Sequence, residues 1–431
     1  MTTLAAPGGV RYEDRSGLVR ELKGPRFALP IAWVATRVVM FLLVSTPNAV
    51  NRLLPDLVAN GDVAGVYYHA YRLMHAGQLP YNGFAYEYPP GTLLPLLALP
   101  RGLSPTTFLF IWELEMVLLD GLVLWAIVLL GRLAGARQAT VRSAAWAWVV
   151  GGMVMSGLFL VRNDLLACAL VAWAAVFLYS RRPALAGLCL GLGTVTKLWP
   201  ALILVLLLVG LRRDRLRMAA GAAVTFIITG IALATTGTLG ACVDYVTKYH
   251  GRRPLEVEAL AARPVQLVAA FSGRRAPVEN TYGSYNLLGY HALVTASSIA
   301  SLAVLVATLL IVRRHGTTTP SLNLLSIATV SLIASSLVTA KVFSPQYVSW
   351  LLVVAVCAGA VGALPRQWLW TAVAVVALTG AEYPLGFGDL LRGNPTMTVI
   401  VLFRDLVLIT LAVGTAVLAI RRRREESLPA T

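Results

Sequence analysis

Residues 346–363 read QYVSWLLVVAVCAGAVGA, a stretch without a single charged side chain. A segment of this length can cross the hydrocarbon core of a bilayer as a helix. Comparable apolar runs recur along the whole 431-residue chain, which is 58% hydrophobic and only 13% charged. Because backbone polar groups in lipid must be satisfied within each segment, these runs predict helices rather than strands. We therefore expect an all-α polytopic membrane protein.

The apolar runs predict a bundle of about 12 transmembrane helices, within a range of about 11 to 13. The expected spans are residues 29–46, 105–130, 143–161, 164–180, 184–197, 199–211, 218–237, 287–312, 321–340, 346–363, 367–383 and 396–420. The apolar segment 91–100 is shorter, and we expect it to be re-entrant or interfacial, with a short span as the alternative. The pair 184–197 and 199–211 is also compatible with one helix broken at Pro200.

The net charge of +16 is open to two interpretations. One is nucleic-acid binding, and the other is the excess of basic residues that membrane proteins keep in their cytoplasmic loops. Basic residues concentrate in the terminal tails and in alternate short connectors, which favours the second interpretation. We therefore expect a multi-pass protein of the plasma membrane, with both termini in the cytoplasm and no nucleic-acid partner.

The expected organisation is a basic cytoplasmic tail at 1–28, a transmembrane domain at 29–420 and a second basic cytoplasmic tail at 421–431. Two long loops, 47–104 and 238–286, then face away from the cytoplasm. The unusual polar residues lie almost entirely in these two loops and in short turns on the same face. The extracytoplasmic face is therefore where we expect a functional site.

Five clusters of polar and aromatic residues stand out on this face. They are Asp62 with Tyr67, Tyr68 and His69, closing with Tyr86–Pro90; Arg162–Asp164; Lys197–Pro200; Tyr249–Glu258; and Lys341–Tyr347. Each cluster has a purely structural alternative. The first loop resembles an aromatic belt with solvated carboxylates, and a lone lysine can extend its charge to the membrane surface. Ion pairs are the alternative for two others, Arg162 with Asp164 in a tight turn and Arg253 with Glu256 on a short helix.

Several familiar sites are absent from the sequence. It contains no P-loop, HExxH or GxSxG motif and no His/Cys cluster with metal-ligand spacing. Its four cysteines are scattered and are expected to be small core residues. No sizeable cytosolic segment is available to bind a nucleotide. A group-transfer enzyme with this organisation would take its donor from the membrane.

A polyprenyl-phosphate sugar is a donor of that kind. Inverting transfer needs one carboxylate to deprotonate the acceptor hydroxyl, and a phosphate leaving group needs cations rather than a general acid. Asp62 is the candidate base. Arg252, Arg253, Lys197 and Lys341 are candidate phosphate ligands, and tyrosines offer flat surfaces for the sugar and the isoprenoid.

On these residues the chain resembles GT-C-type membrane glycosyltransferases, and among them family 87, the polyprenol-phosphate-mannose-dependent α-mannosyltransferases. The resemblance rests on an ordered set of six local signals. They are Asp62, Pro80-Tyr81 leading to Glu87-Tyr88-Pro89-Pro90, Arg162-Asn163-Asp164, Lys197-Leu198-Trp199-Pro200, the segment His250–Glu258, and Ser344-Pro345-Gln346-Tyr347. Together they extend over most of the chain.

The resemblance implies a GT-C fold, a lipid-linked donor and an inverting transfer, with Asp62 as general base. Glu87, in the same loop, is the second candidate catalytic carboxylate. It implies that basic residues of the matched segments bind the donor phosphate: Lys197, His250, Arg252, Arg253 and Lys341. The expected substrate-binding and supporting residues are Tyr67, Tyr68, Tyr81, Tyr88, Arg162, Asp164, Glu256, Glu258, Gln346 and Tyr347.

The expected partners are a polyprenyl-phosphate sugar donor, a lipid or glycan acceptor, and membrane lipids. The sugar is a hexose, with mannose as the first candidate. No cofactor is required by the sequence, which neither implies nor excludes a divalent metal. A polytopic transporter or a lipid or glycolipid flippase is the alternative function, since several ionisable residues lie within the predicted spans.

Overall fold

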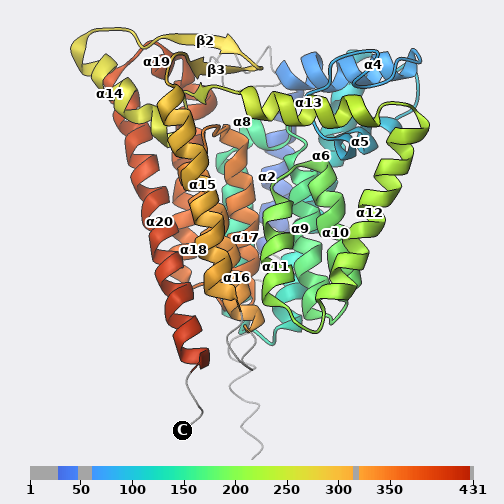
Figure 1. Ribbon diagram of the computed structural model, residues 1–431, viewed down its shortest axis with the longest axis vertical. Coiled ribbons are helices and arrows are strands. Elements are labelled where there is room, and N and C mark those ends of the chain that lie inside the picture. Colours follow the sequence, from blue (N-terminus) through green and yellow to red (C-terminus); the bar gives the residue numbers. More distant parts are fainter. Residues whose placement is uncertain (1–27, 47–60, 314–319, 428–431) are drawn as a thin grey trace, which may run out of the picture.

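The computed structural model describes residues 28–46, 61–313 and 320–427. Long helices run side by side as a bundle, and short helices and a small sheet gather at one end of it (Figure 1). A helix occupies each range predicted to span the membrane. They are α2 (Ala28–Ser45), α6 (Pro105–Leu133), α7 (Gln138–Val154), α9 (Asp164–Tyr179), α10 (Pro183–Thr196), α11 (Pro200–Gly210), α12 (Arg215–Thr235), α15 (His291–Val312), α16 (Leu322–Thr339), α17 (Val348–Ala360), α18 (Arg366–Gly380) and α20 (Pro395–Ser427).

Within the described residues, seven helices are long and apolar enough to cross a membrane by length and composition. The fold is therefore that of a mostly helical, polytopic membrane protein, as predicted. The remaining helices of the bundle are shorter, so the full number of membrane crossings stays a prediction.

Glycines allow α10 and α12 to pack closely. A Cβ atom on Gly187 would lie 1.9 Å from the carbonyl oxygen of Met218, and one on Gly221 would lie 1.9 Å from that of Ala184. No side chain fits at such distances, so the two backbones touch directly. Gly187 and Gly221 thus serve the packing of these two helices.

Buried ion pairs hold several helices together. Arg37 on α2 binds Asp120 on α6 through Nε and Oδ2 at 2.9 Å, and both side chains are fully enclosed. Arg404 on α20 lies 3.0 Å from Glu382, at the end of α18. These pairs neutralise charges that would otherwise be buried alone within the bundle.

One end of the bundle carries the folded parts of the two long loops (Figure 1). From the first loop come η2 (Val63–Tyr68), α4 (His69–His75), η3 (Pro90–Thr92) and α5 (Leu93–Ala98). From the second come α13 (Leu239–Arg252), β1 (Leu255–Glu256), η4 (Leu260–Ala262), α14 (Arg263–Ser272), β2 (Val278–Thr281) and β3 (Ser284–Leu287). Short turns complete this end: α8 (Ser156–Phe159), η5 (Pro345–Tyr347), η6 (Ala381–Gly386) and α19 (Phe387–Leu391).

The three strands form an antiparallel sheet in the order β1-β3-β2. Leu255 pairs with Leu287, and Glu279 pairs with Asn286 across the β2–β3 hairpin. The second loop is thus a small folded platform rather than an irregular connector.

Some predicted boundaries differ from the structure. Segment 91–100 contains only the six-residue α5, too short to cross a bilayer. The span predicted at 143–161 ends at Val154, where α8 follows as a separate turn. α10 and α11 are separate helices because Lys197 between them has extended dihedral angles. α20 continues to Ser427, so the tail predicted from 421 begins as helix. The tail predicted at 1–28 lies outside the described residues, except for Ala28.

Candidate active site

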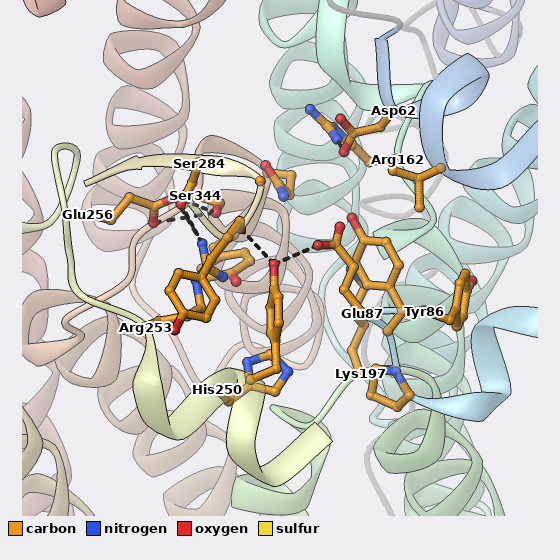
Figure 2. Close-up of a pocket in the computed structure, with 18 of the residues that line it drawn as sticks. Asp62, Tyr86, Glu87, Arg162, Lys197, His250, Arg253, Glu256, Ser284 and Ser344 are labelled. Carbon is orange, nitrogen blue, oxygen red and sulfur yellow. Dashed lines mark hydrogen bonds and ion pairs between the residues drawn. The ribbon is translucent and has the colours of Figure 1, made fainter. Parts of the chain in front are cut away.

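A cavity of about 560 Å³ lies at the end of the bundle that carries the small sheet. Its walls come from the first loop, the starts of α9 and α11, α13, the β2–β3 hairpin, and the turns η5 and η6. Segments hundreds of residues apart in sequence therefore meet around one space. Figure 2 shows charged and aromatic side chains that line it.

Asp62 lies on the first-loop side of the cavity, at the start of η2. It forms an ion pair with Arg162, which precedes α9. The side chain of Asp62 is 33% exposed, whereas that of Arg162 is 9% exposed. The guanidinium thus contacts the carboxylate from the protein side and leaves the other side open to a substrate.

Glu87 lines the cavity between Asp62 and the second-loop platform in the view of Figure 2. The hydroxyl of Tyr249 lies 2.6 Å from its Oε2 and also 2.6 Å from the carbonyl oxygen of Tyr282. Gly283 has a φ of +65°, and a Cβ atom there would lie 3.3 Å from Oε2 of Glu87. The hairpin turn can therefore close over this carboxylate because a glycine occupies the position.

Lys197 is a buried cation at the junction of α10 and α11. Its Nζ lies 3.4 Å from Oδ2 of Asp164 and 4.2 Å from the ring centre of Tyr88. Trp350 donates a hydrogen bond of 2.7 Å to the other oxygen of Asp164. Burial lowers the pKa of Lys197, and Asp164 opposes this shift. These contacts hold the ammonium group at the cavity with one carboxylate partner.

Arg253 is oriented by polar groups of the platform. Its Nη2 lies 2.9 Å from Oγ of Ser284 and 3.4 Å from Oε1 of Glu256. Ser344 donates a 3.2 Å hydrogen bond to the same oxygen of Glu256. The Arg253–Glu256 pair expected as a structural alternative is thus present, but it joins the end of α13 to β1 instead of lying on one short helix. Both residues line the cavity (Figure 2).

His250 precedes this group on α13 and lines the cavity. Its Nε2 is buried and has no hydrogen-bond partner within the part of the chain that the structure describes. Burial lowers the pKa of His250 to about 4, with contributions from Arg253, Lys197 and Lys341. The imidazole is therefore neutral at neutral pH and has one ring N–H to donate.

Glu258, like Glu256, contributes a buried carboxyl group. Its Oε1 is buried without a partner among the described residues, and its side chain lines the cavity. Its backbone carbonyl accepts hydrogen bonds from Arg404 at 2.8 Å and Arg263 at 3.2 Å. Burial, Glu382 and Glu256 raise the pKa of Glu258 well above its ordinary range. The raised pKa favours the protonated form, in which a carboxyl group both donates and accepts hydrogen bonds.

Eleven predicted site residues line the cavity. They are Asp62, Glu87, Tyr88, Arg162, Lys197, His250, Arg253, Glu256, Glu258, Gln346 and Tyr347. The other six lie outside its lining: Tyr67, Tyr68, Tyr81, Asp164, Arg252 and Lys341.

Three of these six residues support the cavity from behind. Tyr67 is buried and stacks on Trp112, with ring centres 4.4 Å apart. Tyr81 donates a 2.7 Å hydrogen bond to the carbonyl oxygen of Tyr88. Lys341 donates one of 2.9 Å to the carbonyl oxygen of Gly251.

The remaining three residues differ in their surroundings. The hydroxyl of Tyr68 donates to the carbonyl oxygen of Leu103 at 3.2 Å, and Asp164 contacts Lys197 as described. Arg252 is exposed at the end of α13. The two adjacent arginines therefore do not both face the cavity.

The structure adds lining residues to which the sequence assigned no role in the site. Tyr86, Tyr249, Trp199 and Ser344 belong to the predicted clusters, whereas Tyr245, Tyr282, Tyr285, Tyr383, Trp350 and Ser284 lie outside them. The i,i+4 spacing of Tyr245 and Tyr249 on a short amphipathic helix is a signal that was available in the sequence. The hairpin residues carried no such signal, because their position depends on the pairing of β2 with β3.

The described ranges contain no group of three or more His, Cys, Asp or Glu side chains placed to hold a metal ion. Three carboxylates of the cavity, those of Asp62, Glu256 and Glu87, contact Arg162, Arg253 and the hydroxyl of Tyr249 respectively.

The lowered pKa of His250 predicts a pH-dependent stability. An unfolded histidine takes up a proton near pH 6.5, whereas folded His250 does so only near pH 4. Between these values the unfolded state binds more protons, so acidification destabilises the fold. From pH 7 to pH 5 in detergent, we expect the melting temperature of the wild-type protein to fall by a few degrees more than that of His250→Gln.

A matched control replaces His291, the exposed first residue of α15. His291→Gln should follow the wild-type melting curve at both pH values. An equal loss of stability in His250→Gln and the wild type would contradict the assigned cause.

The sequence was also compared with known proteins. The profile of glycosyltransferase family 87 matches residues 86–336, more than half of the chain. The matched range contains Glu87, Lys197 and the segment from His250 to Glu258, whereas Asp62 lies before it. No curated protein matches the chain. The chain belongs to glycosyltransferase family 87 and is a membrane glycosyltransferase.

Proposed function

We propose that the protein transfers a hexose, with mannose as the expected sugar, from a polyprenyl-phosphate donor to a lipid-linked or glycan acceptor. The transfer inverts the anomeric centre and takes place on the extracytoplasmic face of the plasma membrane. One observation carries the proposal. A single cavity at the end of the bundle combines an accessible, arginine-paired carboxylate with buried cations and aromatic rings.

Asp62 is the proposed general base. Its carboxylate removes the proton from the acceptor hydroxyl as the acceptor oxygen attacks the anomeric carbon. Its partial exposure leaves room for an acceptor, and its pairing with Arg162 fixes its orientation. Glu87, held by Tyr249, is the second catalytic carboxylate and positions the reacting sugar through its hydroxyls.

The bond from the anomeric carbon to the phosphate oxygen breaks in the same step. The electron pair stays on the phosphate, which leaves as a polyprenyl phosphate with one more negative charge. Lys197 and Arg253 are placed to stabilise this charge, and neutral His250 donates a hydrogen bond. Arg252 and Lys341 lie outside the cavity lining and are assigned a supporting electrostatic role.

The remaining lining groups suit a sugar. Glu258 has a free carboxyl oxygen for a sugar hydroxyl, and Gln346 offers an amide. Tyr347 and Trp350 are stacked with ring centres 3.9 Å apart, and Tyr347 and Tyr88 both line the cavity. Flat aromatic faces of this kind pack against the C–H groups of a sugar ring or an isoprene unit.

The proposed face of the membrane can be tested by cysteine labelling. All four native cysteines are buried, so background labelling should be low. A cysteine at Gln78, exposed beside the cavity end, should react with an impermeant thiol reagent in intact cells. Arg213 is exposed just before α12, at the end of the bundle opposite the cavity (Figure 1). A cysteine at this position is the matched control and should react only after lysis. The reverse pattern would contradict the proposed orientation.

The proposed reaction can be tested with the purified protein in detergent. Incubated with a polyprenyl-phosphate-linked radioactive mannose and a lipid extract, the protein should produce a labelled glycolipid or glycan. A flippase would produce no labelled product under these conditions, because it forms and breaks no covalent bond. Transfer only from a nucleotide sugar would contradict the proposed donor.

A further inference from the structure

Helix α14 is oriented with its charged side inward and its apolar side outward. Arg263 and Gln266 are buried, and Nε of Arg263 lies 2.7 Å from Oδ2 of Asp405 on α20. Val268 and Phe271 point away from the protein and are 68% and 67% exposed. A helix at a water-exposed surface has the opposite arrangement. The outer face of α14 is therefore suited to contact with lipid.

Two arginines follow this helix directly. Gly273 ends α14 in a left-handed conformation, and Arg274 and Arg275 are exposed after it. Neither guanidinium has a hydrogen-bond or ion-pair partner among the described residues. Both line a second cavity of about 390 Å³, together with Val265, Val268 and Tyr290. No acidic residue lines this cavity, so its charge is uncompensated.

The place of α14 in the bundle indicates which part of the membrane the second cavity would face. α14 lies beside the end of α20 that is nearest the active site (Figure 1). Its apolar face therefore reaches the level at which the apolar part of the bundle ends. Arg274 and Arg275 follow at the end of the helix, where phospholipid head groups would be found.

We propose that α14 and Arg274–Arg275 form a binding site for an anionic phospholipid of the leaflet nearest the active site. The two guanidiniums bind the lipid phosphate, and the acyl chains lie against Val268 and Phe271. A phospholipid complements both features of this surface, because one molecule carries a negative phosphate and adjoining hydrocarbon chains. A soluble anion would leave the exposed apolar face uncovered.

The bound lipid would also stabilise part of the active site. The segment after Arg275 enters β2, and the β2–β3 turn carries Tyr282 and Gly283 at the cavity. Ser284 of the same hairpin contacts Arg253. A lipid held at Arg274–Arg275 fixes the other end of this hairpin. Lipid binding itself does not depend on the transfer reaction, so the two proposals can fail separately.

The test is native mass spectrometry of the full-length protein in detergent, titrated with phosphatidylglycerol or phosphatidylcholine. The wild-type protein should retain phosphatidylglycerol preferentially. Arg274→Gln combined with Arg275→Gln should lower the apparent affinity for phosphatidylglycerol by about 10- to 30-fold, because each basic residue near a membrane surface contributes up to about a fivefold gain in lipid affinity. Binding of phosphatidylcholine should change little.

The matched control combines Arg101→Gln with Arg392→Gln, which removes the same charge from exposed positions elsewhere. It should bind phosphatidylglycerol as the wild type does. A third variant, Phe271→Ser, should weaken the binding of both lipids. Equal phosphatidylglycerol binding in the two double variants would overturn the proposal. So would a wild-type dimer that the Arg274/Arg275 variant loses, because the surface would then bind a second copy.

Discussion

Asp62→Asn is expected to lower the rate of sugar transfer by about 10²- to 10⁴-fold, the usual contribution of a general base. The amide of asparagine preserves the shape of the side chain but cannot accept the proton of the acceptor hydroxyl. The loss should therefore appear in kcat, with a smaller change in the KM for the donor. Transfer by purified variants, normalised to the amount of folded protein, measures the effect.

Two controls separate chemistry from folding. Asp244→Asn changes an aspartate of α13 whose side chain is 64% exposed, and this variant should keep wild-type activity. The second control addresses Arg162, which Asp62→Asn leaves buried without its partner. Asp62→Asn combined with Arg162→Gln removes both charges and should remain inactive even if its stability recovers. Full activity in Asp62→Asn would refute the assigned base. If Glu87→Gln lost activity while Asp62→Asn kept it, the role of base would pass to Glu87.

Lys197→Gln is expected to lower kcat/KM for the donor by about 10²- to 10³-fold, comparable to the loss of one group that stabilises a developing charge. The ammonium group is buried at the cavity and lies beside the ring of Tyr88. Its charge is therefore poorly screened by solvent, and its interaction with the leaving phosphate is strong. Initial rates over a range of donor concentrations measure the effect.

The controls for Lys197 follow the same logic. Lys248→Gln neutralises a lysine of α13 that is 58% exposed, and it should have little effect. Lys197→Gln leaves Asp164 without its ammonium partner, so Asp164→Asn is added in a double variant. We expect the double variant to fold better than Lys197→Gln and to remain impaired. Wild-type donor kinetics in the double variant would show that Lys197 serves only to neutralise Asp164.

Hydropathy predicted the helices well because membrane insertion constrains each segment independently of the others. The run at 346–363 is an example, since α17 occupies most of it. Boundaries were less accurate where turns contain no charge. The prediction at 143–161 missed the break after Val154, which no proline or charged residue marks.

The partners of the site residues were harder to predict because they depend on how distant segments meet. The sequence indicated an ion pair between Arg162 and Asp164 in one turn. In the structure Arg162 pairs with Asp62, and Asp164 contacts Lys197. The roles of Tyr249 and Gly283 in enclosing Glu87 depend on the packing of α13 against the hairpin. The sequence alone identified the clusters of polar residues, whereas the fold determines which residues of these clusters contact one another.

The most direct test of the account is the anomeric configuration of the product. Transfer from a polyprenyl-phosphate mannose of known configuration, followed by NMR of the purified product, reports the stereochemistry of the reaction. A single displacement with Asp62 as base predicts a product of the opposite configuration. A product that retains the donor configuration would contradict the account, because it requires a covalent intermediate and therefore a nucleophile in place of the proposed base.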